Sequence, residues 1–206
     1  MKLRDGSGAA GWRLTWPAVV FLALGMAVLA PAQPAPDSPA PVRKPEIRLM
    51  DPVRDAAALA RLESVRGRLP EKYRRRNNFA WAVAQIAGLE KVEYFAHSGI
   101  QSLHDVSAAA AENVAGISLR KKKGGRFEVL CVNHDDEIEG ADCWPRNMDT
   151  EYKIIEDLAA RLADPAAAGR MRLYTDLYPC ASCRHVIEQF LAVYTNVQVQ
   201  VLYREK

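Results

Sequence analysis

The chain has 206 residues, of which 49% are apolar and 26% are charged, and its net charge at pH 7 is +3. The chain is long enough to bury a sizeable core, and its length suits one folded domain with flanking segments. This small net charge does not by itself indicate which class of partner the protein binds. The basic residues are nevertheless clustered at 74–76 and 120–126, an arrangement that suits a polyanionic substrate or a solvated loop.

The first 45 residues do not have the pattern of a folded domain, and they begin with the pattern of an export signal. Basic residues precede an apolar run, Pro17–Ala30, that is shorter than the roughly 20 residues needed to span a bilayer. Ala30 and Ala32 stand at the small-residue positions of a cleavage site. An uncleaved membrane anchor is the alternative. Cleavage would give a secreted or periplasmic protein without stable membrane insertion.

The predicted domain organisation follows from this pattern. Residues 1–32 are expected to form the signal peptide or anchor, residues 33–48 a linker rich in proline and alanine, and residues 49–206 the folded domain.

The folded part shows alternating helix and strand patterns. In the second half, helix, strand, helix and strand follow one another with short links, which predicts βαβ units and a largely parallel sheet. In chain order we expect a helix over 51–68, a strand hairpin over 78–88 and 89–100, a short helix or irregular crossing over 103–115, a strand over 126–133, a polar loop to 145, a helix over 149–163, a strand over 169–177, a helix over 180–194 and a strand over 196–203.

Four cysteines raise the question of redox state. In an oxidising compartment they could form two disulfides. Cys131 and Cys143 lie 12 positions apart across a polar stretch, where a structural disulfide is plausible. Cys180 and Cys183 would close a much smaller loop, which structural disulfides seldom do. This second pair therefore calls for a chemical explanation.

The Cys180–Cys183 pair begins a predicted helix. Both thiols share one face with the apolar residues that follow at helical spacing, and exposed N–H groups at the helix start favour thiolates. This geometry serves a thiol–disulfide oxidoreductase and a zinc site equally well. Against the redox alternative, only about one helix and one strand follow the pair, and Pro179 replaces the usual preceding aromatic residue.

A zinc site needs a further ligand, and the preceding predicted helix offers carboxylates. Glu151 leads an otherwise apolar stripe, and a carboxylate that faces a core needs a partner or a chemical task. The alternative is that Asp149 caps the helix and Glu151 is an acid favoured by the helix dipole.

The sequence resembles a known enzyme superfamily at these two helix starts. "DTE" followed by "YPCASC" is similar to the signature of the zinc-dependent nucleoside and nucleic-acid deaminases. Together with "NFAWAVAQIAG", "AHSGI" and "NVQVQVLY", the stretch from about Leu69 to Tyr203 resembles the bacterial toxin-deaminase branch of polymorphic and contact-dependent toxin systems.

The resemblance implies an α/β fold. We expect a three-layer α/β/α cytidine deaminase-like sandwich of four to five strands, with an N-terminal antiparallel hairpin and parallel strands. A usual later strand of the superfamily is either absent or supplied by an earlier segment.

The resemblance also implies a set of site residues. Asp149, Cys180 and Cys183 would hold Zn²⁺, and Glu151 would move protons without being a ligand. Most deaminases have His or Cys where this chain has Asp149, although aspartate is part of the resemblance to the toxin branch and is a normal zinc ligand. Alternative third ligands are His97, His134 and Cys143.

The implied enzyme is a zinc-dependent hydrolase of the C–N bonds of cyclic amidines. Its expected substrate is cytosine in single-stranded DNA or RNA, and it would act as an exported bacterial toxin with a cognate immunity protein as partner. Free nucleoside as substrate and an inactive, zinc-stabilised binding module remain alternatives. The expected substrate contacts are Asn78, His97, Arg146, Thr175 and Tyr178. A turn role for Asn78 and a structural role for His97 are also open.

Overall fold

The computed structural model describes residues 43–204. The predicted signal peptide and most of the predicted linker lie outside the described residues. Within the described range, no helix is long and apolar enough to cross a membrane.

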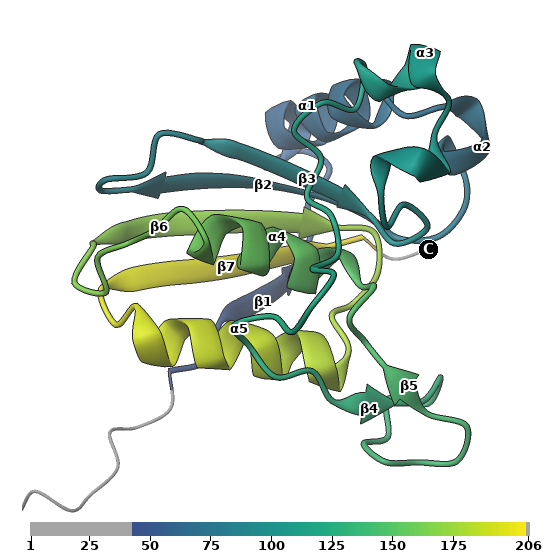
Figure 1. Ribbon diagram of the computed structural model, residues 1–206. Coiled ribbons are helices and arrows are strands. Elements are labelled where there is room, and N and C mark those ends of the chain that lie inside the picture. Colours follow the sequence, from purple (N-terminus) through teal and green to yellow (C-terminus); the bar gives the residue numbers. More distant parts are fainter. Residues whose placement is uncertain (1–42, 205–206) are drawn as a thin grey trace, which may run out of the picture. The chain divides into compact units, whose positions relative to one another are not determined.

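The centre of the fold is a mixed sheet of five strands. The hairpin strands β2 and β3 are antiparallel to each other, β2 is antiparallel to β6, and β6, β7 and β1 run parallel. The predicted N-terminal hairpin and parallel strands are therefore confirmed. Across the sheet the order is β1 (Glu46–Leu49), β7 (Val197–Tyr203), β6 (Gly169–Thr175), β2 (Phe79–Ile86) and β3 (Glu93–His97) (Figure 1).

Helices cover both faces of this sheet, which gives the predicted three layers. Alternate strand residues point to opposite faces. On one face Trp81 and Tyr174 pack with α1, while on the other Ala82 and Met171 pack with α4 and α5. The long helices are α1 (Ala56–Arg66), α4 (Thr150–Ala159) and α5 (Ala181–Val193), and the short ones are α2 (Glu71–Arg74), the 3₁₀ helix η1 (Leu103–Asp105) and α3 (Ala108–Ala111).

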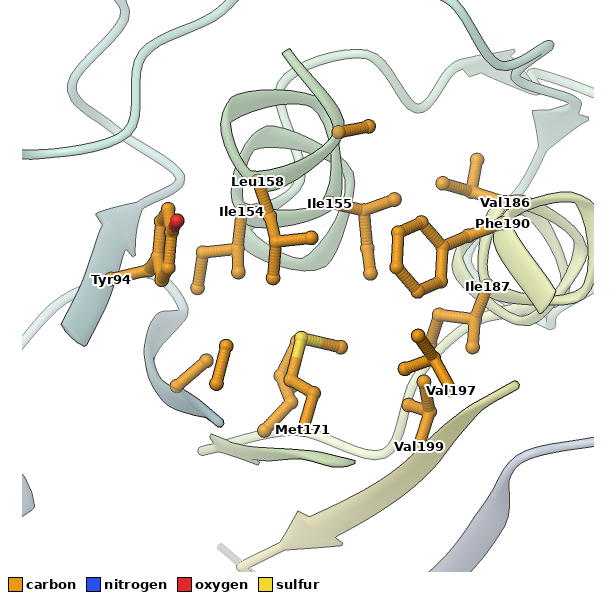
Figure 2. Packing of buried hydrophobic residues seen from close by; sticks show 14 of the residues in the cluster. Tyr94, Ile154, Ile155, Leu158, Met171, Val186, Ile187, Phe190, Val197 and Val199 are labelled. Carbon is orange, nitrogen blue, oxygen red and sulfur yellow. The ribbon is translucent and has the colours of Figure 1, made fainter. Parts of the chain in front are cut away.

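The larger apolar core lies under α4 and α5. Figure 2 shows Ile154, Ile155 and Leu158 of α4 between Tyr94 of β3 and Phe190 of α5, above the strand residues. All five of these side chains are fully buried. This packing fixes how α4 and α5 lie on the sheet, and therefore where their first residues lie.

The strand β1 supplies the sheet edge beside β7. It pairs in parallel, with Glu46 opposite Gln200 and Leu49 opposite Tyr203. A strand from the start of the folded part thus lies next to β7 at the edge of the sheet. This was one of the two alternatives expected for the later strand of the superfamily. The strand overlaps the end of the predicted linker at residues 46–48, so the sheet begins at Glu46.

The predicted strand over 126–133 is largely wrong. Only β4 (Cys131–Val132) is a strand, and it pairs with β5 (Trp144–Pro145) outside the main sheet. The backbone N–H groups before β4 donate instead to side chains of α4 and α5, so the segment crosses these helices in extended form (Figure 1). Cys131 and Cys143 form a disulfide that joins the ends of the loop between β4 and β5.

The topology brings several chain segments to one end of the sheet. α4 leads into β6 and α5 follows it, so both helices begin near the end of β6 at Thr175. β2 is antiparallel to β6, with Ala80 opposite Thr175, so the residue before β2 reaches the same end. The starts of α4, α5 and β2 therefore meet where the parallel strands end, which is the usual place for a site in an open α/β sheet.

A buried ion pair holds α1 to this end of the sheet. Both guanidinium NH groups of Arg66 donate to Asp176, at 2.9 and 2.6 Å, and Asp176 also accepts from the N–H of Phe79. The Arg66 and Asp176 side chains are only 12% and 3% exposed. The pair ties α1 to β2 and to the first residue after β6.

We expect Arg66→Leu to lower the free energy of unfolding by about 3–5 kcal/mol, because it leaves the Asp176 carboxylate buried without its cation. Urea unfolding measures this loss. As a control, Arg161→Leu removes an exposed partner of Asp157, and the expected loss is below about 1 kcal/mol. Equal losses in the two variants would contradict the structural role of the buried pair.

Candidate functional site

Three side chains with metal-binding atoms converge at the starts of α4 and α5. Asp149 immediately precedes α4, Cys180 immediately precedes α5, and Cys183 lies in the first turn of α5. Among the described residues they form the one group of three or more His, Cys, Asp or Glu side chains close enough to share a metal ion. Cys183 is buried and the other two are partly buried.

The spacing of these atoms fits a tetrahedral ion. The Oδ2 atom of Asp149 lies 3.4 Å from each sulfur, and the two sulfurs are 3.4 Å apart. A tetrahedral zinc with ligands at about 2.0–2.3 Å holds them roughly 3.5–3.8 Å from one another. The separations of 3.4 Å are close to this range, so these three atoms could hold a zinc ion, and a tetrahedral ion held by three ligands would keep a fourth position for a water or substrate.

Asp149 is at the helix N-cap position but does not cap the helix. Its side chain makes no capping hydrogen bond, whereas the Cys180 sulfur accepts from the N–H of Cys183. The alternative interpretation of Asp149 as a simple cap is therefore not supported by its contacts. Its carboxylate faces the two thiols instead.

The surroundings of Cys183 favour a neutral thiol unless a cation is present. The hydrogen bond with Cys180, then burial, then the negative charge of Glu151 raise the pKa of the Cys183 thiol well above its usual value. A bound cation reverses this preference, because metal coordination deprotonates a thiol. The donor set of two thiols and one carboxylate thus fits Zn²⁺ chemically as well as by spacing.

Glu151 lies beside this group, buried, in the first turn of α4. Its Oε1 accepts from the Thr175 hydroxyl at 2.7 Å and its Oε2 accepts from the Thr150 hydroxyl at 2.9 Å. The Asn78 amide donates to both hydroxyls, at 2.8 and 3.0 Å. The four side chains form a closed ring of hydrogen bonds that fixes the Glu151 carboxyl group.

Burial raises the pKa of Glu151, and the nearby charge of Asp149 raises it further. The hydrogen bonds from the two threonines act in the opposite direction. A carboxyl group held between these effects can both take up and release a proton, which is the property required of a general acid–base residue.

A cavity of about 640 Å³ opens onto the metal group and Glu151. This size is within the roughly 300–1,000 Å³ that is typical of small-molecule sites. Its lining contains these four residues, Asn78, Arg146 and Tyr178 of the predicted set, and also Asn77, Ser98, Asn133, His134, Asp136, Trp144, Met148 and Leu177.

Three predicted substrate contacts line this cavity. Tyr178 is 52% exposed, with the Arg184 guanidinium over its ring at 5.4 Å and the Tyr203 ring at a steep angle 5.0 Å away. Arg146 donates to the carbonyls of Val132 and Asn133 and stacks on Trp144 at 3.9 Å, so much of its guanidinium group is used within the protein. The Asn78 donors are likewise used in the ring around Glu151.

Two other predicted contacts lie behind the cavity wall. Thr175 is fully buried and reaches the site through its hydrogen bond to Glu151. His97 is also fully buried and does not line the cavity. Its Nδ1 accepts from Gly99, so its Nε2 carries the proton and donates to the Arg76 carbonyl. His97 therefore connects two backbone segments, and burial lowers its pKa.

Cys143 and His134, the other two alternatives for the third zinc ligand, make different contacts. Cys143 is in the disulfide with Cys131. The His134 ring packs edge-on against Trp144, with ring centres 4.8 Å apart, and His134 is not part of the metal-binding group.

Sequence reasoning missed three residues that shape the site. Thr150 is a second hydrogen-bond donor to Glu151. Asp136 accepts from the Ala181 N–H and from Arg184, which anchors the loop between β4 and β5 at the start of α5. Trp144 forms part of the cavity wall. Thr150 could have been noticed beside Glu151, but the other two come from a loop whose path the sequence does not reveal.

A buried lysine on α4 supports the turn behind the cavity. The Lys153 ammonium donates to the carbonyls of His97 and Ile100 at 2.9 and 2.8 Å. Ser98 in this turn exchanges two hydrogen bonds with Asn78. Burial lowers the pKa of Lys153 from 10.5 to about 7.

This shift makes a prediction about stability and pH. Between pH 7 and 10.5 the unfolded state binds more protons at Lys153 than the folded state does, so stability should rise with pH in this window. The unfolding free energy of the wild type, relative to Lys153→Met, should therefore increase by up to about 1.4 kcal/mol per pH unit. Urea unfolding at pH 7, 8 and 9 tests this expectation. A constant difference would contradict it.

Comparison with known proteins places the site in a family. A family model described as "Toxin-deaminase: The BURPS668_1122 family of deaminases" matches residues 62–205, which is well over half of the chain and contains all of the predicted site residues. No curated protein and no solved structure matches the chain.

Proposed function

The chain belongs to this Toxin-deaminase family, and on that premise we propose that it is a zinc-dependent hydrolytic deaminase of cytosine in nucleic acid. The observation that carries the proposal is the equilateral triangle of Asp149, Cys180 and Cys183 beside a buried Glu151 in the lining of a cavity. A metal group and a separate carboxyl group are the two parts that the chemistry needs.

Zinc, when bound by Asp149, Cys180 and Cys183, would lower the pKa of a water molecule towards about 7 and so supply the nucleophile. Glu151 takes a proton from the attacking water and delivers it to the ring nitrogen. It then carries the second proton to the amine. The ring carbon gains an oxygen, its bond to the amine breaks, and a keto base and ammonia leave.

The ring of hydrogen bonds around Glu151 supports this role. Each carboxyl oxygen accepts from one threonine, so the group is held in one orientation while it exchanges protons. Asn78 fixes both threonines and therefore acts as a positioning residue. Its amide oxygen accepts from the Leu177 N–H at 3.2 Å, which also ties the loop after β6 to the ring.

The lining of the cavity supports a nucleobase as substrate. Deaminases of this chemistry read a base by stacking and by hydrogen bonds to its edge. Tyr178 and Trp144 bring aromatic rings to the wall, and Asn77 brings a side-chain amide. The Asn133 amide also lies at the wall but is hydrogen-bonded within its own loop. These groups suit a flat, polar ring.

We further propose that the protein acts after export as a toxin. The N-terminal sequence pattern and the disulfide between Cys131 and Cys143 support passage through an oxidising compartment. A cell that makes such a toxin would need a cognate immunity protein as a partner.

The test is deamination by the purified, zinc-loaded chain of single-stranded DNA, RNA, cytidine and adenosine, followed by sequencing and ammonia release. We expect cytosine-to-uracil conversion in a polymer, one zinc per chain, and loss of both after chelation. Zinc binding without deamination of any substrate would point to a binding module. Disulfide exchange that depends on Cys180 would favour an oxidoreductase.

A further inference from the structure

The cations of the described domain divide into paired and unpaired groups. Eight form ion pairs with an Asp or Glu side chain: Arg48, Arg54, Arg61, Arg66, Lys91, Arg161, Arg184 and Arg204. The two basic clusters of the sequence, 74–76 and 120–126, contain none of these eight. Within residues 43–204, no acidic side chain pairs with the exposed cations of either cluster.

The first cluster borders the cavity directly. Arg74, Arg75 and Arg76 are exposed, and the next two residues, Asn77 and Asn78, line the cavity. The carbonyl of Arg76 accepts from His97, so the backbone of this cluster is tied to the turn behind the cavity. The backbone that carries these charges is therefore held beside the cavity.

The second cluster lies along a groove that adjoins the cavity. Arg120, Lys121 and Lys122 line a shallow groove of about 500 Å³ together with Asn147 and Tyr152. Asn147 lies between Arg146 and Met148, which both line the cavity, so one chain segment separates groove from cavity. The groove is thus a neighbour of the cavity, with unpaired cations along its edge.

The composition of the second cluster favours a polyanion over a lipid surface. Residues 120–126 read "RKKKGGR" and contain no apolar side chain between the cations. Segments that bind membranes usually combine cations with exposed Trp, Phe or Leu side chains. Single-stranded nucleic acid instead needs a positive groove for its backbone and aromatic rings for its bases, and the aromatic rings are in the cavity.

We propose that the groove at 120–126 and the arginines at 74–76 form a track for the phosphodiester backbone of a single strand, which crosses the cavity mouth between them. This inference rests on the proposed deaminase function and makes a polymer, rather than a free nucleoside, the substrate. Phosphates on both sides of the target nucleotide would contact the two clusters while its base enters the cavity.

Binding of a fluorescent oligo(dT) strand to the full chain tests the track without any deamination, since thymine has no amine to lose. We expect the triple variant Lys121→Gln, Lys122→Gln, Lys123→Gln to bind roughly tenfold or more weakly at 0.1 M salt. The slope of log affinity against log salt should fall by about 2, because each phosphate neutralised on a single strand contributes about 0.7. Arg75→Gln with Arg76→Gln should also weaken binding.

The matched control is Arg170→Gln with Arg172→Gln. These arginines are exposed and without an acidic ion-pair partner in the described range, and they lie on the sheet face opposite α4 and α5. Their replacement should leave oligo(dT) binding within about twofold. Equal losses in the control and in the lysine variant would overturn the track, as would unchanged binding in the lysine variant.

Two further outcomes separate this inference from the proposed function. Oligonucleotide binding through the track without deamination of any substrate would leave the track in place and reject the deaminase activity. Deamination of cytosine in a single strand, with equal efficiency in the wild type and the lysine variant, would keep the activity and reject the track. If the lysine variant instead loses binding to anionic phosphatidylserine vesicles but keeps oligo(dT) binding, residues 120–126 are a membrane-binding segment and the proposal is rejected.

Discussion

Glu151→Gln should lower the rate of deamination by about 10²–10⁴-fold, the usual contribution of a general acid–base residue. Glutamine keeps the size of the side chain and one hydrogen-bond acceptor but cannot take up or release the proton. Neither zinc content nor substrate affinity should change, since the metal-binding group of Asp149, Cys180 and Cys183 does not include Glu151. Ammonia release and zinc content, measured on the same preparation, give both results.

The same substitution should not destabilise the fold. Burial raises the pKa of Glu151, so its ionised form is costly in the folded state, and glutamine carries no charge. We therefore expect a melting temperature equal to or above that of the wild type. A loss of activity together with retained stability would be the signature of a functional residue rather than a structural one.

Glu156→Gln is the matched control for this experiment. Glu156 is a buried glutamate on the same helix, and it accepts from the backbone N–H of Phe127, which glutamine can also do. Its replacement should leave the rate of deamination unchanged. Activity of Glu151→Gln within about tenfold of the wild type would contradict proton transfer by this residue.

The metal-binding group and Glu151 could be predicted because they lie at two helix starts. Helix periodicity places Asp149 and Glu151 in one first turn and Cys180 and Cys183 in another, and one strand separates the helices. Chain order then brings both starts to the same end of the sheet. The positions of these four side chains were thus implied by local patterns together with one rule of topology, whereas their expected roles came from the resemblance to deaminases.

The ring around Glu151 could not be predicted in the same way. Asn78, Thr150 and Thr175 come from the start of β2, the start of α4 and the end of β6, and each is a common residue at an element boundary. Nothing local distinguishes Asn78 from a turn residue. Its role depends on the pairing of β2 with β6, and that pairing joins segments far apart in the sequence.

Two backbone segments differ from expectation for related reasons. Residues 126–133 alternate like a strand, but Glu156, Gln189 and Ser182 take the N–H groups that a sheet partner would have taken. Glu46–Leu49 is only 4 residues long and follows a proline-rich stretch, so it shows no period of its own. Its conformation depends on the open edge of β7, which the sequence does not display.

Asp149→Ala should lower the affinity for zinc by more than roughly 100-fold, because it removes a direct ligand. Loss of a residue that only supports a ligand usually lowers the affinity by roughly 10–100-fold. Deamination should be lost in parallel. Asp149→His should restore both in large part, since Nδ1 of histidine is as many bonds from Cα as the aspartate oxygen and is a normal zinc ligand. Competition with a chromophoric chelator measures the affinity.

Asp136→Asn is the control for Asp149→Ala, because it also removes a negative charge from the cavity wall but removes no residue of the metal-binding group. Asp136 also lines the cavity, but its carboxylate bonds the Ala181 N–H and Arg184 and is not in the metal-binding group. Its replacement should leave one zinc per chain at nearly wild-type affinity. If Asp149→Ala also keeps that affinity while Cys180→Ser loses it, the third ligand is another group. In that case the 3.4 Å contacts between the Asp149 carboxylate and the two sulfurs reflect hydrogen bonds of the thiols rather than a metal site.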